Sequence, residues 1–139
     1  MNKNKIKLGI VGGGMNSTIG KAHITALRMD GNFDIVSGFF SRNKKINYQT
    51  LKFLNINIDK NYKNLEQYLK YELKNIDVFL ILTDSFSHFE NINTLLKTKK
   101  PIICEKPTVV NLNDLKKIIN KINKTKIRFF PFYNYTGYP

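Results

Sequence analysis

Three features of the 139-residue sequence predict an α/β fold with a parallel sheet. Short apolar runs, typical of strands that are covered on both faces, recur along the chain. Segments with helical periodicity separate these runs, as in consecutive strand–helix–strand units. The first run, 6–11, leads into a glycine-rich turn and a helical pattern that begins near Ile19. We therefore expect one domain with a doubly wound sheet of about six strands in the order 3-2-1-4-5-6, between two layers of helices.

Length and composition restrict the class of protein. A chain of this size could bury roughly two thirds of its unfolded surface, and a hydrophobic fraction of 42% is typical of a folded domain. Cys104 is the single cysteine, so no internal disulfide can form. No run approaches the ~18 apolar residues of a membrane span, and the N-terminal stretch does not fit a signal peptide. We expect a cytoplasmic protein with no membrane partner.

The formal net charge of +13 raises nucleic acid as a partner. However, the positive charge is nearly all lysine scattered along the chain, and arginine occurs only as Arg28, Arg42 and Arg128. There is no zinc-ligand spacing and no strip of arginine and aromatic residues. We therefore expect no metal site and no nucleic-acid partner, with a basic nucleic-acid-binding domain as an alternative.

The glycine-rich turn is a candidate phosphate-binding loop. Gly12 allows a tight turn after the strand, Gly14 lacks the Cβ that would block a pyrophosphate, and Gly20 lets the following helix approach closely. The helix N-terminus at Ile19 offers unpaired N–H groups to an anion. Five residues separate Gly14 from Gly20, where the dinucleotide fingerprint has two, so the turn contains an insertion. The alternative is a glycine-rich turn that binds no ligand.

The same turn also has to be compared with the P-loop of NTPases. That loop has four residues between its glycines and a hydroxyl residue after its lysine. Here five residues intervene and Ala22 follows Lys21, so no hydroxyl is available for magnesium. The pattern disfavours an NTPase.

Two further strand ends carry candidate cofactor-binding residues. The run 33–40 ends at Ser41 and Arg42, where an NAD enzyme would have an acid for the ribose, so these residues favour NADP; the alternative is that Arg42 is a solvated loop residue. The run 77–82 ends at Thr83, at the sheet edge where ligands bind. His88 follows at the start of the next helix, where it could face the cofactor or simply pack on the loop.

A third strand end carries a candidate for catalysis. The run 101–104 is followed by Glu105, Lys106 and Pro107, and the proline disfavours a helical conformation at the residue before it. A lysine held there could exchange a proton with a hydroxyl group. Cys104 is interpreted as core filler. The alternative is that Lys106 only forms a surface ion pair with Glu105.

These residues resemble the glucose-fructose oxidoreductase and inositol dehydrogenase (Gfo/Idh/MocA) family over essentially the whole chain. The matching motifs are Ile19-Gly20-Lys21-Ala22-His23 after the glycine loop and Glu105-Lys106-Pro107 after a cysteine-containing strand. A subgroup of the family also has a longer glycine loop and the segment that stands here at 134–139.

The resemblance implies NAD(P)-dependent hydride transfer to or from a sugar, cyclitol or related polyol. It implies that Thr83 and Ser85 flank the cofactor, that Glu105 orients Lys106, and that Lys106 hydrogen-bonds the reacting oxygen. Family members continue into a second domain that forms the substrate pocket and usually the oligomer interface. We therefore expect 1–139 to be the NAD(P)-binding domain without its C-terminal substrate domain, and inactive alone. The alternative is a stand-alone dinucleotide-binding module.

Overall fold

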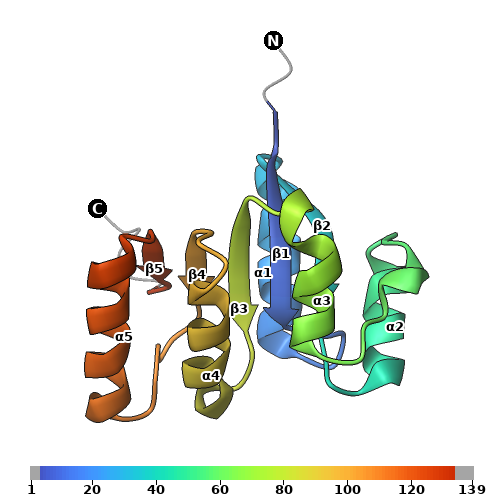
Figure 1. Cartoon of the computed structure of the whole chain (residues 1–139). Coiled ribbons are helices and arrows are strands. Elements are labelled where there is room, and N and C mark those ends of the chain that lie inside the picture. Colours follow the sequence, from blue (N-terminus) through green and yellow to red (C-terminus); the bar gives the residue numbers. More distant parts are fainter. Residues whose placement is uncertain (1–3, 134–139) are drawn as a thin grey trace.

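A parallel five-stranded sheet forms the middle layer of the computed structural model, which describes residues 4–133 (Figure 1). Its strands lie in the order β2-β1-β3-β4-β5. Their bounds are β1 Ile6–Gly12, β2 Phe33–Phe39, β3 Val78–Leu82, β4 Ile102–Cys104 and β5 Phe129–Pro131. All neighbouring pairs are parallel, so the carboxyl ends of the strands meet at one edge of the sheet. The predicted Rossmann-type doubly wound sheet is confirmed.

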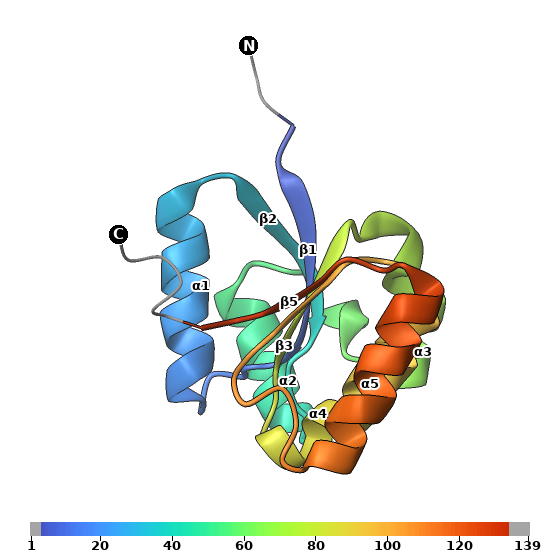
Figure 2. The same cartoon turned by 90° about the vertical axis from the view of Figure 1, so that its left-hand side faces the viewer.

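Helices cover both faces of this sheet (Figure 2). Their bounds are α1 Thr18–Asp30, α2 Lys44–Phe53, α3 Leu65–Glu72, α4 Ser85–Leu96 and α5 Leu112–Thr125, with short 3₁₀ turns η1 Ile58–Lys60 and η2 Leu73–Asn75. α1 and α2 pack on one face, where Ile24 and Leu51 join a buried cluster with the strands. α3, α4 and α5 pack on the other face, where Tyr68, Ile92 and Ile118 do the same.

Every one of these α-helices begins at a residue whose side chain accepts a backbone N–H from the first turn, which satisfies a donor that has no partner within the helix. These capping residues are Ser17, Asn43, Asn64, Asp84 and Asn111. α1 ends at Gly31, whose φ of 71° is the left-handed conformation that favours glycine.

The predicted strand count of about six is corrected to five among residues 4–133. The observed order is the expected 3-2-1-4-5-6 without its first edge strand. The segment after α2 instead forms the 3₁₀ turn η1, in which the Asn57 side chain accepts the N–H of Asp59. A polar segment that makes its hydrogen bonds locally has little to gain from joining a sheet.

β2 is therefore an edge strand, and it contains an irregularity. The register between β1 and β2 shifts between Leu8 and Gly9, which leaves Val36 out of the pairing. The Lys60 ammonium lies 3.4 Å from the Val36 carbonyl oxygen and donates a hydrogen bond to it. A side chain thus occupies part of the edge that a further strand would have covered.

No helix within residues 4–133 has the length and apolar character needed to cross a membrane. The same residues contain no group of three or more histidine, cysteine or acidic side chains placed to hold a metal ion.

Candidate functional site

The glycine loop is built around close backbone contacts. Gly12 and Gly13 have φ values of 86° and 69°, which side chains with a Cβ rarely adopt. A Cβ on Gly20 would clash with the carbonyl oxygen of Gly13, so the helix after the loop can only approach because residue 20 is glycine. A Cβ on Gly14 would press against the Ile46 side chain and the carbonyl oxygen of Phe40. The loop is therefore also a packing junction with α2.

Polar contacts fix the loop to α1 and α2. The Ser17 hydroxyl oxygen accepts the N–H of Gly20 at 3.0 Å, and the Ser17 N–H donates to the Gly14 carbonyl at 2.7 Å. The N–H of Met15 donates to the hydroxyl oxygen of Thr50 on α2 at 3.0 Å. The remaining N–H groups of the first turn of α1 have no intrahelical acceptor, which makes this end of α1 suited to an anion.

A cavity of about 650 Å³ opens beside this loop at the carboxyl edge of β1, β2 and β3. Its volume lies within the usual range for small-molecule and cofactor sites. Its charged lining residues are Arg42, Lys63, Glu66, Asp84 and Glu90. Its other lining residues are Val11, Gly12, Gly13, Gly14, Asn16, Ser17, Phe39, Phe40, Ser41, Asn64, Leu65, Leu82, Thr83, Ser87, Asn91 and Thr94.

Asp84 places a negative charge at the mouth of this cavity. It caps α4 by accepting hydrogen bonds from the Ser87 N–H at 3.0 Å and from the Ser87 hydroxyl at 2.8 Å. These bonds lower the pKa of Asp84, and the positive charge of Arg42 lowers it further. Arg42 therefore shares its surroundings with a carboxylate.

The turn after β4 forms a second group of candidate residues. The carboxylate of Glu105 is buried and lies 2.8 Å from Nε2 of His23 on α1. Its other oxygen accepts the backbone N–H of Lys106, also at 2.8 Å. The ring of Phe132 makes an edge contact with His23, with 4.8 Å between the ring centroids.

The Lys106 side chain is exposed, and its ammonium makes no hydrogen bond or ion pair with the rest of residues 4–133. The surface ion pair between Lys106 and Glu105, considered as an alternative above, is therefore not formed. Glu105 instead contacts the backbone of Lys106 and directs its charge toward His23.

His88 connects the two groups from within the core. Its ring is buried, with Nδ1 2.8 Å from the carbonyl oxygen of Pro107 and Nε2 3.0 Å from that of Thr83. The ring therefore links the cavity loop to the turn that carries Lys106. His88 does not line the cavity.

The structure brings five of the expected cofactor-binding residues to the cavity: Gly12, Gly14, Ser41, Arg42 and Thr83. Gly20 supports the loop from behind, through its contact with Gly13. Ile19 and Ser85 lie in the first turns of α1 and α4 but do not line the cavity. The segment 134–139, which contributed to the family resemblance, lies outside the described residues.

Sequence reasoning missed two parts of this site. The segment 63–66 forms a wall of the cavity although it lies far along the chain from the glycine loop, and no local motif marks it. His23 was noticed only as part of a motif, and its pairing with Glu105 joins residues 82 positions apart. The interpretation of Cys104 as core filler agrees with its burial, which raises the pKa of its thiol to about 12 and keeps it protonated at neutral pH.

Comparison with known proteins identifies the same type of domain. The model of the GFO/IDH/MocA family, described as an oxidoreductase family with an NAD-binding Rossmann fold, matches residues 6–133. Myo-inositol 2-dehydrogenase from Thermotoga maritima is 29% identical over 79 residues, which cover 57% of this chain and 23% of that protein.

Solved structures agree on the fold. An oxidoreductase from Sinorhizobium meliloti is 30% identical, with a TM-score of 0.88 over 98% of this chain and 38% of its own. An inositol dehydrogenase homolog from Azotobacter vinelandii, solved with NAD+, is 23% identical, with a TM-score of 0.87 over 99% of this chain and 37% of its own. The chain thus spans less than two fifths of the length of these relatives.

Proposed function

The chain belongs to the GFO/IDH/MocA oxidoreductase family as its NAD-binding Rossmann-fold domain, and from this premise we propose that it binds NAD(P) along the carboxyl edge of its sheet. The cavity beside the glycine loop is the observation that carries the proposal. A Cβ at Gly12, Gly13 or Gly20 would clash with Thr83, Leu82 or Gly13, so only glycines allow the loop to adopt this compact shape beside the cavity. A pyrophosphate beside this loop would accept N–H groups from the start of α1.

We further propose that Lys106 acts on a sugar, cyclitol or related polyol in the complete oxidoreductase. NAD(P), when bound, supplies the hydride acceptor or donor at its nicotinamide ring. Lys106 would exchange a proton with the reacting hydroxyl, for which it is suited because its ammonium is exposed and not committed to Glu105. The inositol dehydrogenase relatives support a polyol substrate.

NADP is proposed as the preferred form of the cofactor because Ser41 and Arg42 follow β2, where the adenosine ribose of a bound dinucleotide lies. Arg42 lines the cavity and can reach a 2′-phosphate there. Asp84 opposes this preference, since its carboxylate competes for the same guanidinium. The ratio of the NADPH and NADH affinities therefore measures whether the Arg42 guanidinium or the Asp84 carboxylate has the larger influence on the cofactor.

Nucleotide titration of the 139-residue chain tests the proposal. We expect NADH or NADPH to bind without magnesium, whereas magnesium-dependent ATP binding or salt-sensitive nucleic-acid binding would support the alternatives. Gly20→Ala should abolish binding because its Cβ would displace the Gly13 backbone. Lys21→Ala is the matched control: the side chain is exposed and does not line the cavity, so binding should persist.

The isolated chain is expected to bind nucleotide without oxidising a polyol. This expectation rests on length, because the chain spans only 37% of the inositol dehydrogenase homolog. Turnover by the isolated chain would show that the active site has been placed wrongly.

A further inference from the structure

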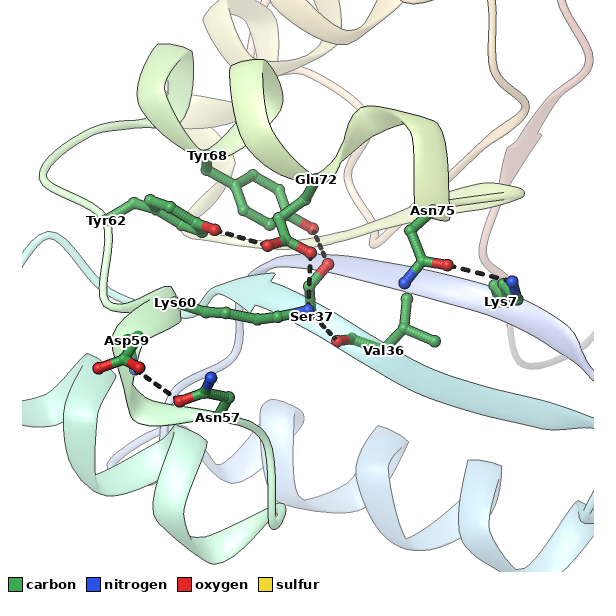
Figure 3. Close-up of polar contacts among 10 residues, drawn as sticks. All are labelled: Lys7, Val36, Ser37, Asn57, Asp59, Lys60, Tyr62, Tyr68, Glu72 and Asn75. Atoms are coloured by element: carbon green, nitrogen blue, oxygen red, sulfur yellow. Dashed lines mark hydrogen bonds and ion pairs between the residues drawn. The ribbon is translucent and has the colours of Figure 1, made fainter.

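A buried carboxylate on the side of the sheet away from Lys106 has no role in the proposed chemistry. Glu72, the last residue of α3, is buried with its carboxylate facing the segment that follows η1 (Figure 3). The Lys60 ammonium lies 2.9 Å from one carboxylate oxygen, and the Tyr62 hydroxyl donates to the other. A buried charge of this kind is stable only when both oxygens are satisfied, as they are here.

The surrounding groups make the arrangement rigid. Lys60 also donates to the Val36 carbonyl on β2, and the buried Tyr68 hydroxyl lies 3.2 Å from that of Ser37 on the same strand (Figure 3). The Tyr62 ring stacks on Tyr71 with an angle of 9° between the ring planes. Burial, and then the neighbouring Glu72, raise the pKa of Tyr62 above its usual value, so its hydroxyl remains a donor at neutral pH.

A second, independent set of contacts holds the residue between Lys60 and Tyr62. Asn61 accepts a hydrogen bond from the Asn47 amide at 2.9 Å and donates to the Lys44 carbonyl at 3.2 Å. Asn47 in turn accepts the N–H of Phe40 at 2.7 Å. The chain at 60–62 is thereby tied to α2 and to the end of β2, next to Ser41.

The residues that follow directly, 63–66, line the same cavity as the glycine loop, Ser41 and Arg42. The adenosine half of a dinucleotide lies at the end of β2 in this fold, and Asn61 is tied to that end through Asn47 and Phe40. From these contacts we infer that Glu72 is a positioning residue for the adenosine side of the cofactor site. It acts through Lys60 and Tyr62, and the inference rests on the proposed binding of NAD(P).

The test compares the 139-residue chain with its Glu72→Gln variant, using ADP-ribose as the probe of the adenosine side. The amide keeps the size of the side chain but removes the charge that holds Lys60. We expect the Kd for ADP-ribose to rise between about threefold and thirtyfold, the range expected for residues that act through a network. In ¹⁵N NMR spectra, the amides at 63–66 should stop responding to ADP-ribose, whereas those at 12–14 should still shift.

Asp114→Asn provides a matched control. It removes the charge of another ion pair, between Asp114 and Lys117 on the exposed face of α5, which does not line the cavity. Its Kd for ADP-ribose should equal that of the unmodified chain. Should Glu72→Gln not fold, Tyr62→Phe decides the question, because it removes one donor and keeps the ring packing. A rise in the Kd supports the inference, and an unchanged Kd overturns it.

Two other results would overturn the inference while leaving NAD(P) binding intact. One is a Glu72→Gln variant that binds ADP-ribose as tightly as the unmodified chain. The other is a variant in which the amides at 12–14 lose their response together with those at 63–66, which would indicate a general structural effect. An unmodified chain that binds neither NADH nor ADP-ribose would instead contradict the proposed function itself.

Discussion

The two buried glutamates of this domain, Glu72 and Glu105, have similar burial but different partners. Glu72 is held by a lysine and a tyrosine within 12 residues along the chain, at the edge of the sheet. Glu105 is held by His23, which comes from the opposite end of the chain, and by the backbone of Lys106. The Lys60 ammonium forms an ion pair with Glu72. The Lys106 ammonium, which follows Glu105 in the sequence, has no partner within residues 4–133.

Under the two proposals above, Glu72 fixes a wall of the cavity, whereas Glu105 leaves the Lys106 ammonium available to a substrate. Lys60 cannot act on a ligand without leaving Glu72 uncompensated, which is costly for a buried charge. The Lys106 ammonium makes no ion pair with Glu105 because one carboxylate oxygen of Glu105 contacts Nε2 of His23 and the other accepts a backbone N–H. A lysine beside a glutamate in sequence is therefore no evidence that the two side chains pair.

The largest expected effect concerns Lys106 in an oxidoreductase of the relatives' full length that carries this domain. General acid–base help is typically worth ~10²–10⁴ in rate, so Lys106→Ala should lower kcat by a factor in that range. The affinity for NAD(P) should change far less, because the loop N–H groups hold the pyrophosphate. Steady-state kinetics at saturating cofactor measures kcat, and a fluorescence titration with the nucleotide measures the affinity. Lys116→Ala, an exposed lysine on α5, is the control; a kcat for Lys106→Ala within threefold of the unmodified enzyme would remove Lys106 from the mechanism.

The second prediction compares the two carboxylates directly in the same enzyme. Glu105→Gln should lower kcat by about tenfold to a hundredfold, since small misplacements of a reacting group have effects of that size. Glu72→Gln should leave kcat at saturating cofactor unchanged and act on cofactor affinity alone. Equal losses of kcat in the two variants would show that the comparison is wrong and that both residues are simply structural.

The third prediction concerns the cavity wall formed by Arg42. Removing a charged partner of a phosphate should weaken NADPH binding by about tenfold or more, with little change for NADH. Fluorescence titration of the Arg42→Ala chain with both nucleotides measures the ratio. Arg128→Ala removes the same charge at an exposed position outside the cavity and serves as the control. If the ratio of the NADPH and NADH affinities is the same in the unmodified chain, in Arg42→Ala and in Arg128→Ala, the assignment to NADP is wrong.

The last prediction has the smallest effect: the folded domain should lose stability at alkaline pH when the Tyr62 hydroxyl, which donates to Glu72, ionises. Tyr62 has a raised pKa in the folded state, so its contribution to stability is complete below its ordinary pKa of about 10 and is lost as the pH rises above it. Between pH 9 and pH 11 this loss should reach about 1 kcal/mol. Urea unfolding should show that the free energy of unfolding falls less with pH in Tyr62→Phe than in the unmodified chain. In Tyr48→Phe, whose ring is exposed, it should fall as much as in the unmodified chain. A Tyr62→Phe variant with the same alkaline loss as the unmodified chain would contradict this.

Short-range interactions account for the features that could be predicted from the residues alone. The glycine turn, the apolar strands and the asparagine caps depend on backbone freedom, side-chain period and neighbouring hydrogen bonds, all of which act within a few residues. They sufficed to predict the parallel sheet, the α1 loop at Gly12 to Gly20 and the edge at which Thr83 and Arg42 would meet. The position of Lys106 before Pro107 marked it as a candidate for catalysis, the family resemblance added the role of Glu105, and both roles stay predictions.

The pairing of groups that are distant along the chain depends on how the elements pack in three dimensions. The bond from His23 to Glu105 spans 82 positions, and no spacing rule encodes it, since it depends on how α1 packs beside β4. The same holds for His88, for which facing the cofactor and packing on the loop were both open and whose ring contacts the carbonyl oxygens of Thr83 and Pro107. The segment that stands in place of the expected edge strand also has distant partners, since Lys60 of η1 contacts Glu72 on α3 and the Val36 carbonyl on β2.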